Sequence, residues 1–171
     1  MAEGPGVRML LIVTGSTLRA EEMDRPLGYY LKQRIERALV EAGGADKQGL
    51  EDYVVQVVAD FRWIHDKPLQ GLPTITVGGP SVNALTHRWL EEVPVTLAYN
   101  DRYFIQMDPD LVEPRVSIWG MDNATTQIAV SVFVDRFLPR FLERCAALSA
   151  HLTSFDGNGD ADTGADDKDE E

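Results

Sequence analysis

The sequence predicts an α/β protein, a three-layer α/β sandwich whose sheet is mostly parallel and ends in an antiparallel edge hairpin. Three observations lead to this class. Short apolar runs alternate with stretches in which apolar residues recur every three or four positions. The first of these runs, residues 9–13, lacks the alternation of a half-exposed strand, which is typical of a strand buried on both faces. The length of 171 residues suits one compact core and excludes two large domains.

The N-terminal part predicts a strand followed by a long helix. Residues 9–13 form an unbroken apolar run that ends in the polar sequence 14–17. Asp24 is expected to cap the helix, with Pro26 in its first turn, and the glycines at 43–44 are expected to end it. Six apolar residues share one face of this helix: Leu27, Leu31, Ile35, Ala38, Leu39 and Ala42.

The middle of the chain predicts two strands and a second helix. The longer strand covers residues 53–61, or extends to Ile64, and a short β-branched strand follows at 74–77. Residues 78–81, Gly-Gly-Pro-Ser, are expected to open the helix, because proline is common at the first helical position. Four apolar residues then recur at helical spacing: Val82, Leu85, Trp89 and Val93.

A hairpin and one more strand complete the predicted sheet. Residues 95–99 and 103–107 flank Asn100 and Asp101, two residue types that tolerate the positive φ of a tight turn. Residues 115–119 form a further short strand. The hairpin is the antiparallel part of the sheet and is expected at its edge.

The last helix has an unusual composition. Asp122 is a natural N-cap for it, and between residues 128 and 134 only Ser131 is polar. A helix that is apolar nearly all round is either deeply buried or faces another subunit. A homodimer through this helix is therefore one expectation. Pro139 would remove a backbone hydrogen bond inside a helix, so a kink or a new helix start is expected there.

The acidity is concentrated at the C-terminus. The formal net charge is −12, and residues 156–171 alone carry six Asp, two Glu and one Lys. This segment has no aromatic or branched aliphatic residue, so it cannot bury enough apolar surface to fold. We therefore predict a single α/β domain over residues 1–150 and a disordered acidic tail over residues 151–171.

The tail begins with oxygen-bearing residues at every second position, as in calcium-binding loops. Ala161 and Asp167 replace the turn glycine and the final glutamate of such a loop, and no amphipathic helix follows. A solvated tail is therefore favoured over a calcium site or a docking segment.

Composition also bears on partners and compartment. The acidic balance disfavours nucleic acid, because that affinity comes from Lys and Arg neutralising phosphates. No stretch approaches the roughly 20 apolar residues of a membrane span, and residues 1–13 lack the pattern of a signal peptide. Cys145 is the only cysteine, which excludes an internal disulfide, and a buried, inert thiol is expected. The expectation is a cytoplasmic protein with neither a membrane nor a nucleic-acid partner.

Three loops fall where α/β sheets bind ligands, beyond the carboxyl ends of the strands and near a switch in strand order. They are residues 14–17, 78–83 and 120–123. Many mononucleotide-binding proteins of Rossmann-like or flavodoxin-like fold hold a phosphate at the first of these positions, an analogy of fold alone. Eight residues are the predicted ligand-binding set: Ser16, Thr17, Gly78, Gly79, Ser81, Asn83, Asp122 and Asn123.

Loop 78–83 carries most of this prediction. Its glycines would let the backbone approach a ligand, and a helix starting there would direct N–H groups at an anion. We therefore expect a phosphate-bearing or other anionic metabolite, a nucleotide among the candidates, oriented by Asn83. A tight turn with no ligand is the alternative for the loop. A non-catalytic assembly or regulatory module, acting through the last helix, is the alternative function.

Catalysis is only weakly indicated. Ser81 lies in an incomplete nucleophile elbow that lacks the second glycine, and His151 lies beside the tail. His65 and Asp66 could bind a metal, but no further ligand stands at a suitable spacing, so no metal site is predicted. The sequence names no cofactor and does not decide whether the protein is an enzyme.

Overall fold

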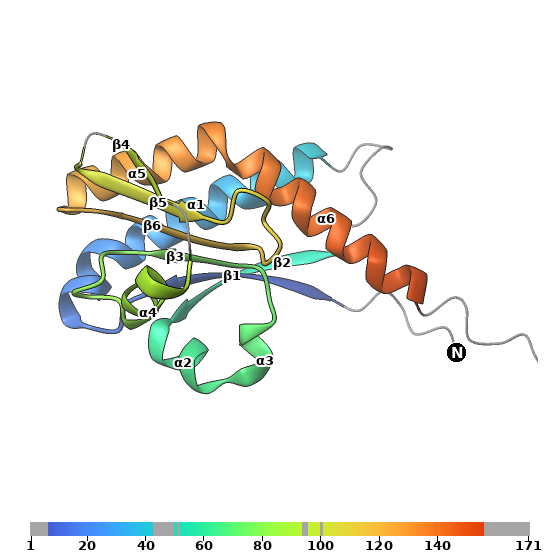
Figure 1. The fold of residues 1–171 in the computed structure, drawn as a ribbon, viewed down its shortest axis with the longest axis horizontal. Helices are drawn as coiled ribbons and strands as arrows, with labels where there is room; N and C mark the ends of the chain where they lie inside the picture. The colour runs from blue at the N-terminus through green and yellow to red at the C-terminus, as the bar shows by residue number, and fades with distance from the viewer. Residues whose placement is uncertain (1–6, 43–49, 51, 94–95, 100, 156–171) are drawn as a thin grey trace, which may run out of the picture.

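The computed structural model describes residues 7–42, 50, 52–93, 96–99 and 101–155. In this part of the chain, a six-stranded sheet lies between two layers of helices (Figure 1). The strands are β1 (Arg8–Thr14), β2 (Tyr53–Ala59), β3 (Thr74–Val77), β4 (Thr96–Tyr99), β5 (Tyr103–Met107) and β6 (Arg115–Gly120). The three-layer α/β class predicted from the sequence is thereby confirmed.

The strand order is β2-β1-β3-β6-β5-β4. The first four of these strands are parallel, with Leu11 of β1 opposite Gln56 of β2 and Thr74 of β3. β5 is antiparallel to both β6 and β4, so the predicted hairpin lies at the sheet edge. Asp101 in its turn has a φ of 53°, and Asn100 lies outside the described residues.

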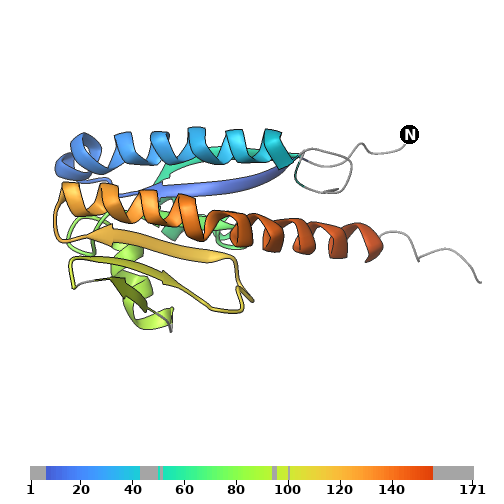
Figure 2. The ribbon, with the colours of Figure 1, turned by 90° about the horizontal axis from the view of Figure 1, so that it is seen from above.

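The described helices are α1 (Leu18–Ala42), α2 (Asp60–His65), α3 (Lys67–Gln70), α4 (Ala84–Glu92), α5 (Asn123–Arg136) and α6 (Leu138–Phe155). α1, α5 and α6 cover one face of the sheet, and α2, α3 and α4 lie on the other (Figures 1 and 2). α6 runs well past the end of the sheet at which the parallel strands begin. It reaches Phe155, which is beyond the predicted start of the tail, and residues 156–171 lie outside the described part.

Each face of the sheet has its own apolar core because consecutive strand residues point to opposite faces. Ile12 of β1 packs in the cluster under α1, α5 and α6, with Ile35 and Phe133. Leu11 packs in the second cluster, with Trp63 of α2 and Trp89 of α4. This double burial explains why β1 reads as an unbroken apolar run.

The apolarity of α5 is explained largely within the chain. Its buried residues include Val130, Phe133 and Val134, which belong to the cluster between sheet and helices. Ile128 is 50% exposed on the outer side. Burial therefore accounts for most of this composition, and the homodimer stays a prediction. α5 ends at Arg136 and α6 begins at Leu138, so Pro139 stands in the first turn of a new helix, as expected.

Three predicted boundaries are wrong. α1 begins at Leu18, where the Thr17 hydroxyl accepts from the amide N–H of Ala20, so Asp24 is an interior residue and not the cap. The second strand stops at Ala59 and gives way to α2. The helix expected to open at residues 78–81 begins at Ala84 instead. Side-chain caps set the starts of α1 and α4, and α2 takes the place of the strand end and buries Trp63 against the sheet.

Among the described residues, no helix combines the length and the apolar character required to cross a bilayer.

Candidate functional site

The three predicted loops meet at one end of the sheet, the end at which the parallel strands terminate. β1 lies between β2 and β3 in the sheet. The chain therefore passes from β1 to a strand on one side and then from β2 to a strand on the other side of β1, which makes this end a switch point in the strand order. The first two loops are in direct contact. A Cβ at Gly15 would stand 1.9 Å from the carbonyl oxygen of Val82, so no larger residue fits there.

A pocket of about 160 Å³ opens between loops 78–83 and 120–123 and the first turns of α1. Four residues of the predicted set line it: Gly79, Ser81, Asp122 and Asn123. The sequence did not indicate the α1 side of the lining, which consists of Arg19, Met23 and Asp24.

The other four predicted residues do not line the pocket. Ser16 and Thr17 are exposed at the start of α1, and Thr17 acts as its cap. Gly78 is buried with a φ of 110°, a conformation that favours glycine. Asn83 lies beneath the loop. The structure thus brings together half of the predicted set and gives Thr17, Gly78 and Asn83 positions that serve the fold.

Asn83 connects the loop after β3 to the sheet. Its Nδ2 donates to Oγ1 of Thr76 at 2.8 Å and to the carbonyl oxygen of Val77 at 3.0 Å. Its Oδ1 accepts from the backbone N–H groups of Leu85 and Thr86 at 3.0 and 3.1 Å. The amide is 1% exposed, so these contacts leave it little capacity for a ligand.

The N-terminus of α4 is also satisfied from within the chain. Asp60 accepts from the N–H of Ala84 at 2.7 Å with one carboxylate oxygen and from the N–H of Phe61 with the other. The N–H of His87 donates to the carbonyl oxygen of Asn83. The first four N–H groups of this helix therefore have partners in the protein, so they do not form the anion site expected at loop 78–83.

The N-terminus of α5 borders the pocket and carries a negative charge. Asp122 caps it in a reciprocal arrangement with Thr125, accepting from its N–H at 2.8 Å and from its hydroxyl at 2.7 Å. These hydrogen bonds lower the pKa of the Asp122 carboxyl, so it is ionised at neutral pH. The Thr126 hydroxyl accepts from the N–H of Gly120 at 3.0 Å and closes the inner wall.

Asp24 is the most unusual group in the pocket. Its side chain is only 7% exposed, and burial raises its pKa from 3.8 to about 6, against the opposing charge of Arg19. Within the described ranges no hydrogen bond reaches its carboxylate. A buried carboxyl group with a pKa close to neutrality and a place in a cleft is typical of functional sites.

A signal for Asp24 was present in the sequence. Ala20, Asp24, Gly28, Leu31 and Ile35 recur at spacings of four, four, three and four, and all five are buried. Pro26, two residues further along, favours a cap at Asp24 instead. In the buried stripe of a longer helix, however, Asp24 is a charged residue that faces the core.

The catalytic alternatives find no support in the described residues. Ser81 lies at the carboxyl end of the sheet, whereas α6 carries His151 toward the opposite end (Figure 1). His65 is exposed, and no group of three or more potential metal-binding side chains occurs in the described part of the chain.

No protein-family model, curated protein or solved structure matches this chain. The interpretation of the pocket therefore depends on its own geometry and chemistry.

Proposed function

We propose that this protein is a small-ligand-binding α/β domain, and that its ligand offers a hydrogen-bond donor to Asp24 in the pocket at the carboxyl end of the sheet. The observation that carries the proposal is the Asp24 carboxylate, buried in the pocket wall without a hydrogen-bond donor among the described residues. The position of the pocket at the switch point of the sheet also favours a ligand site.

An unpaired buried carboxylate weakens a fold, because its charged form loses hydration and gains no hydrogen bond in return. At neutral pH the burial of Asp24 therefore opposes folding, and the charge of Arg19 offsets only part of this cost. A ligand N–H or O–H group would supply the missing donor. With a pKa of about 6, the carboxyl group is mostly ionised at pH 7 and suits an amine, an amidine or the N–H edge of a nucleobase.

The surroundings favour a donor-bearing group over a phosphate. Among the described residues that line the pocket, Asp24 and Asp122 are acidic and Arg19 is the single base. Two helix N-termini at this end of the sheet, those of α4 and α5, are occupied by Asn83, Asp60 and Asp122. An anionic metabolite stays a prediction from the sequence. In the arrangement proposed here, any acidic portion of the ligand would lie toward Arg19 at the exposed rim.

A thermal-shift screen tests the proposal. The panel contains free amines, guanidines and nucleosides, with inorganic phosphate and nucleoside monophosphates as the anionic set. A compound that stabilises the wild-type protein is then measured on Asp24→Asn and on Gly79→Ala, which adds a methyl group to the pocket lining. A Cβ at Gly79 meets nothing closer than 3.8 Å, so this variant should fold normally.

Gly71→Ala is the matched control, since Gly71 lies at the other end of the sheet and a Cβ there also has room. The proposal is supported if the compound no longer raises the melting temperature of Asp24→Asn, raises that of Gly79→Ala by less, and raises that of Gly71→Ala as much as that of the wild type. Binding that is equally strong in Asp24→Asn would contradict it.

A further inference from the structure

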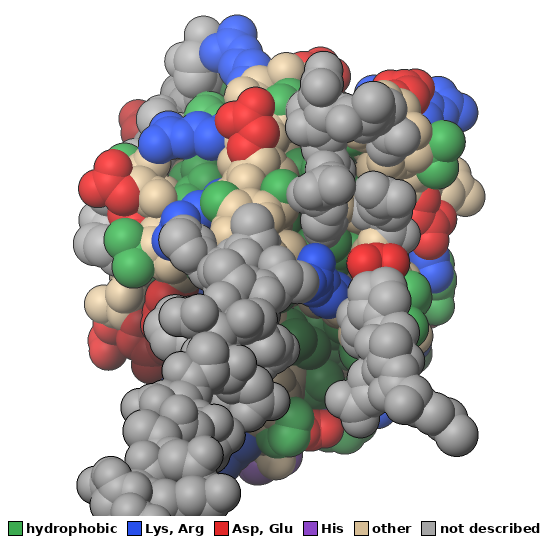
Figure 3. Space-filling view, turned by 90° about the vertical axis from the view of Figure 1, so that its right-hand side faces the viewer, with side chains coloured by type: hydrophobic (Ala, Val, Ile, Leu, Met, Phe, Trp, Pro, Cys, Tyr) green, Lys and Arg blue, Asp and Glu red, His purple; other side chains and the backbone are tan. Residues whose placement is uncertain are grey.

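A second cavity lies at the opposite end of the sheet, where the parallel strands begin. Its volume is about 560 Å³, well above that of the pocket near Asp24. It lies where α6 passes beyond the sheet, and Figure 3 shows this face of the molecule, with apolar side chains in a hollow and charged side chains around it. The volume falls within the roughly 300–1,000 Å³ typical of small-molecule sites.

The lining of this cavity is mainly apolar. It consists of residues in or beside four strands, at the end of α3 and on α6. Its apolar members include Met9, Leu72, Pro73, Val112, Pro114 and Leu148. The hydroxyl of Tyr53 contacts the carbonyl oxygen of Cys145 and Oγ of Ser149, each at 3.1 Å, so this polar group already has partners. An apolar ligand body would therefore find a largely apolar surface here.

Among the described residues that line the cavity, Arg8, Arg115 and Glu113 are charged, which leaves one excess positive charge. This local excess contrasts with the net charge of −12 of the whole chain. Arg115 also borders a separate cavity of about 290 Å³, and that one is acidic, with Glu92, Asp108 and Glu113 in its lining. An anion is therefore favoured on the side of the larger cavity.

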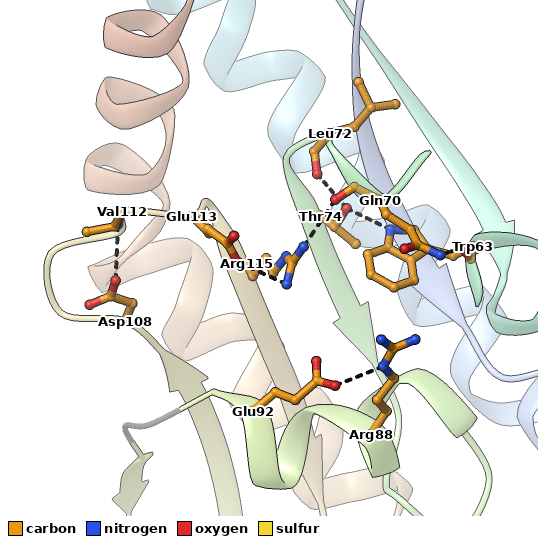
Figure 4. Close-up of polar contacts among 10 residues, drawn as sticks. All are labelled: Trp63, Gln70, Leu72, Thr74, Arg88, Glu92, Asp108, Val112, Glu113 and Arg115. Atoms are coloured by element: carbon orange, nitrogen blue, oxygen red, sulfur yellow. Dashed lines mark hydrogen bonds and ion pairs between the residues drawn. The ribbon is translucent and has the colours of Figure 1, made fainter. Parts of the chain in front are cut away.

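Arg115 is held in place by its neighbours (Figure 4). Its Nη2 donates to the carbonyl oxygen of Gln70 at 3.2 Å, and its Nη1 lies 2.9 Å from Oε2 of Glu113. The guanidinium carbon lies 5.7 Å from the ring centroids of both Trp63 and Trp89. These contacts fix a guanidinium whose side chain is 25% exposed.

The position of Trp63 is fixed in turn. Its indole N–H donates to Oγ1 of Thr74 at 3.2 Å, and its ring packs edge-on against Trp89 at a centroid distance of 5.5 Å. A guanidinium has five N–H donors, so the contacts with Gln70 and Glu113 leave others for a ligand. Glu113 is 67% exposed, and such an exposed ion pair contributes little, so it would yield readily to a competing carboxylate.

From this arrangement we propose that the cavity binds an amphipathic carboxylate, whose alkyl or aryl body occupies the apolar lining and whose carboxylate pairs with Arg115. The planar fork of arginine matches a carboxylate in geometry, and its ordered side chain has little conformational entropy left to lose on binding. Arg8 adds a second positive charge at the same cavity. This site is separate from the proposed function at Asp24, and either proposal can fail without the other.

Decanoate is a suitable probe, measured by titration calorimetry and by the change in tryptophan emission. We expect saturable binding to the full-length wild-type protein, and about tenfold weaker binding to Arg115→Gln, the usual effect of losing a charge-assisted hydrogen bond. Arg115→Lys keeps the charge without the fork and should give an intermediate affinity. Arg88→Gln is the matched control, because Arg88 pairs with Glu92 on α4 and does not line the cavity.

Several outcomes would overturn the proposal. These are no saturable binding of decanoate, equal binding of decanol, and unchanged affinity in both Arg115 variants. Near-ultraviolet circular dichroism shows whether Arg115→Gln keeps its tertiary structure. If it does not, the affinity of Arg115→Lys for decanoate tests the proposal in its place. A chain lacking residues 156–171 is titrated in parallel. Binding that appears only in this shortened chain would identify the acidic tail as the occupant and would also overturn the proposal.

Discussion

The carboxylate of Asp24 in α1 lies against the backbone of Gly78 after β3, so closely that a Cβ at Gly78 would stand 2.6 Å from Oδ2. Gly78 also has a φ of 110°, which side-chain-bearing residues rarely adopt. Its amide N–H donates to the carbonyl oxygen of Ile118, which fixes the loop relative to β6. The absence of a side chain at this position therefore creates the space in which Asp24 is buried.

The two neighbouring glycines should respond differently to substitution. Gly78→Ala introduces both backbone strain and a clash with Asp24, and we expect it to lower the free energy of unfolding by about 1–3 kcal/mol. Gly79→Ala meets only ordinary contacts and should change stability by less than about 0.5 kcal/mol. Urea denaturation of both variants measures this difference. Equal stability of the two would contradict the role assigned to Gly78.

Asp24→Asn should stabilise the protein in a pH-dependent way. The pKa of Asp24 is raised from 3.8 to about 6 on folding, so the folded state binds the proton more tightly than the unfolded state. The contribution of Asp24 to stability is therefore fully present below pH 3.8 and is lost as the pH rises to about 6. Asp24→Asn does not undergo this loss. Its free energy of unfolding should therefore exceed that of the wild type by little near pH 4 and by on the order of 2 kcal/mol above pH 7.

Unfolding in urea at a series of pH values measures this advantage. Asp135→Asn removes the same charge from an exposed position on α5 and controls for the change in net charge. An advantage for Asp24→Asn that is equal at pH 4 and pH 8 would show that its carboxyl group is not destabilised by burial.

Asn83→Ala should be among the most destabilising single substitutions in the loop after β3. It removes the cap of α4 and leaves the N–H groups of Leu85 and Thr86 without their acceptor. It also removes the donor to Thr76 and Val77. From the typical cost of losing a cap and buried hydrogen bonds, we expect a loss of about 2–4 kcal/mol. Asn83→Ser keeps a neutral capping oxygen and should recover part of this loss; no recovery would mean that the cap matters little.

The sequence predicted strands more reliably than it predicted the starts of helices, and the reason is physical. β1 and β3 are buried on both faces, and the apolar run of β1 and the β-branched run of β3 are enough to identify them. The start of α1 depends on the Thr17 side chain, and the start of α4 on Asn83 and the distant Asp60. A contact between residues 60 and 84 depends on the tertiary fold, and a local pattern does not report it.

The prediction of the candidate site from the sequence has the same limit: it does not include contacts that depend on the tertiary fold. The rule that ligands bind at strand ends selected the loops after β3 and β6, and residues of both loops line the pocket, because the rule follows from topology. It did not indicate Asp24, since that residue enters the pocket from the side of a helix and becomes unusual only through burial. It also assigned Asn83 to a ligand, because the sequence does not show that every polar atom of this amide already has a partner.

A substitution on the outer side of α5 tests the alternative function, that of an assembly module. Ile128 is half exposed on this helix, and Ile128→Lys would place a charge in any interface formed there. If burial within the chain explains the composition of α5, the variant should match the wild type in mass by light scattering and in thermal stability. A dimeric wild type that the substitution converts to a monomer would instead establish the homodimer.

Cys145 should report on the contact between α6 and β2. Its thiol is fully buried, and burial raises its pKa to about 12, so it should not react with thiol reagents at pH 8 unless α6 opens. The hydroxyl of Tyr53 donates to the carbonyl oxygen of Cys145 at 3.1 Å. Tyr53→Phe removes this hydrogen bond with little change in shape, so it should increase the labelling rate several-fold, as expected for a loss of about 1 kcal/mol. Urea-unfolded protein, which should react at once, is the control. Rapid labelling of the native wild type would show that α6 is not closed over Cys145 in solution.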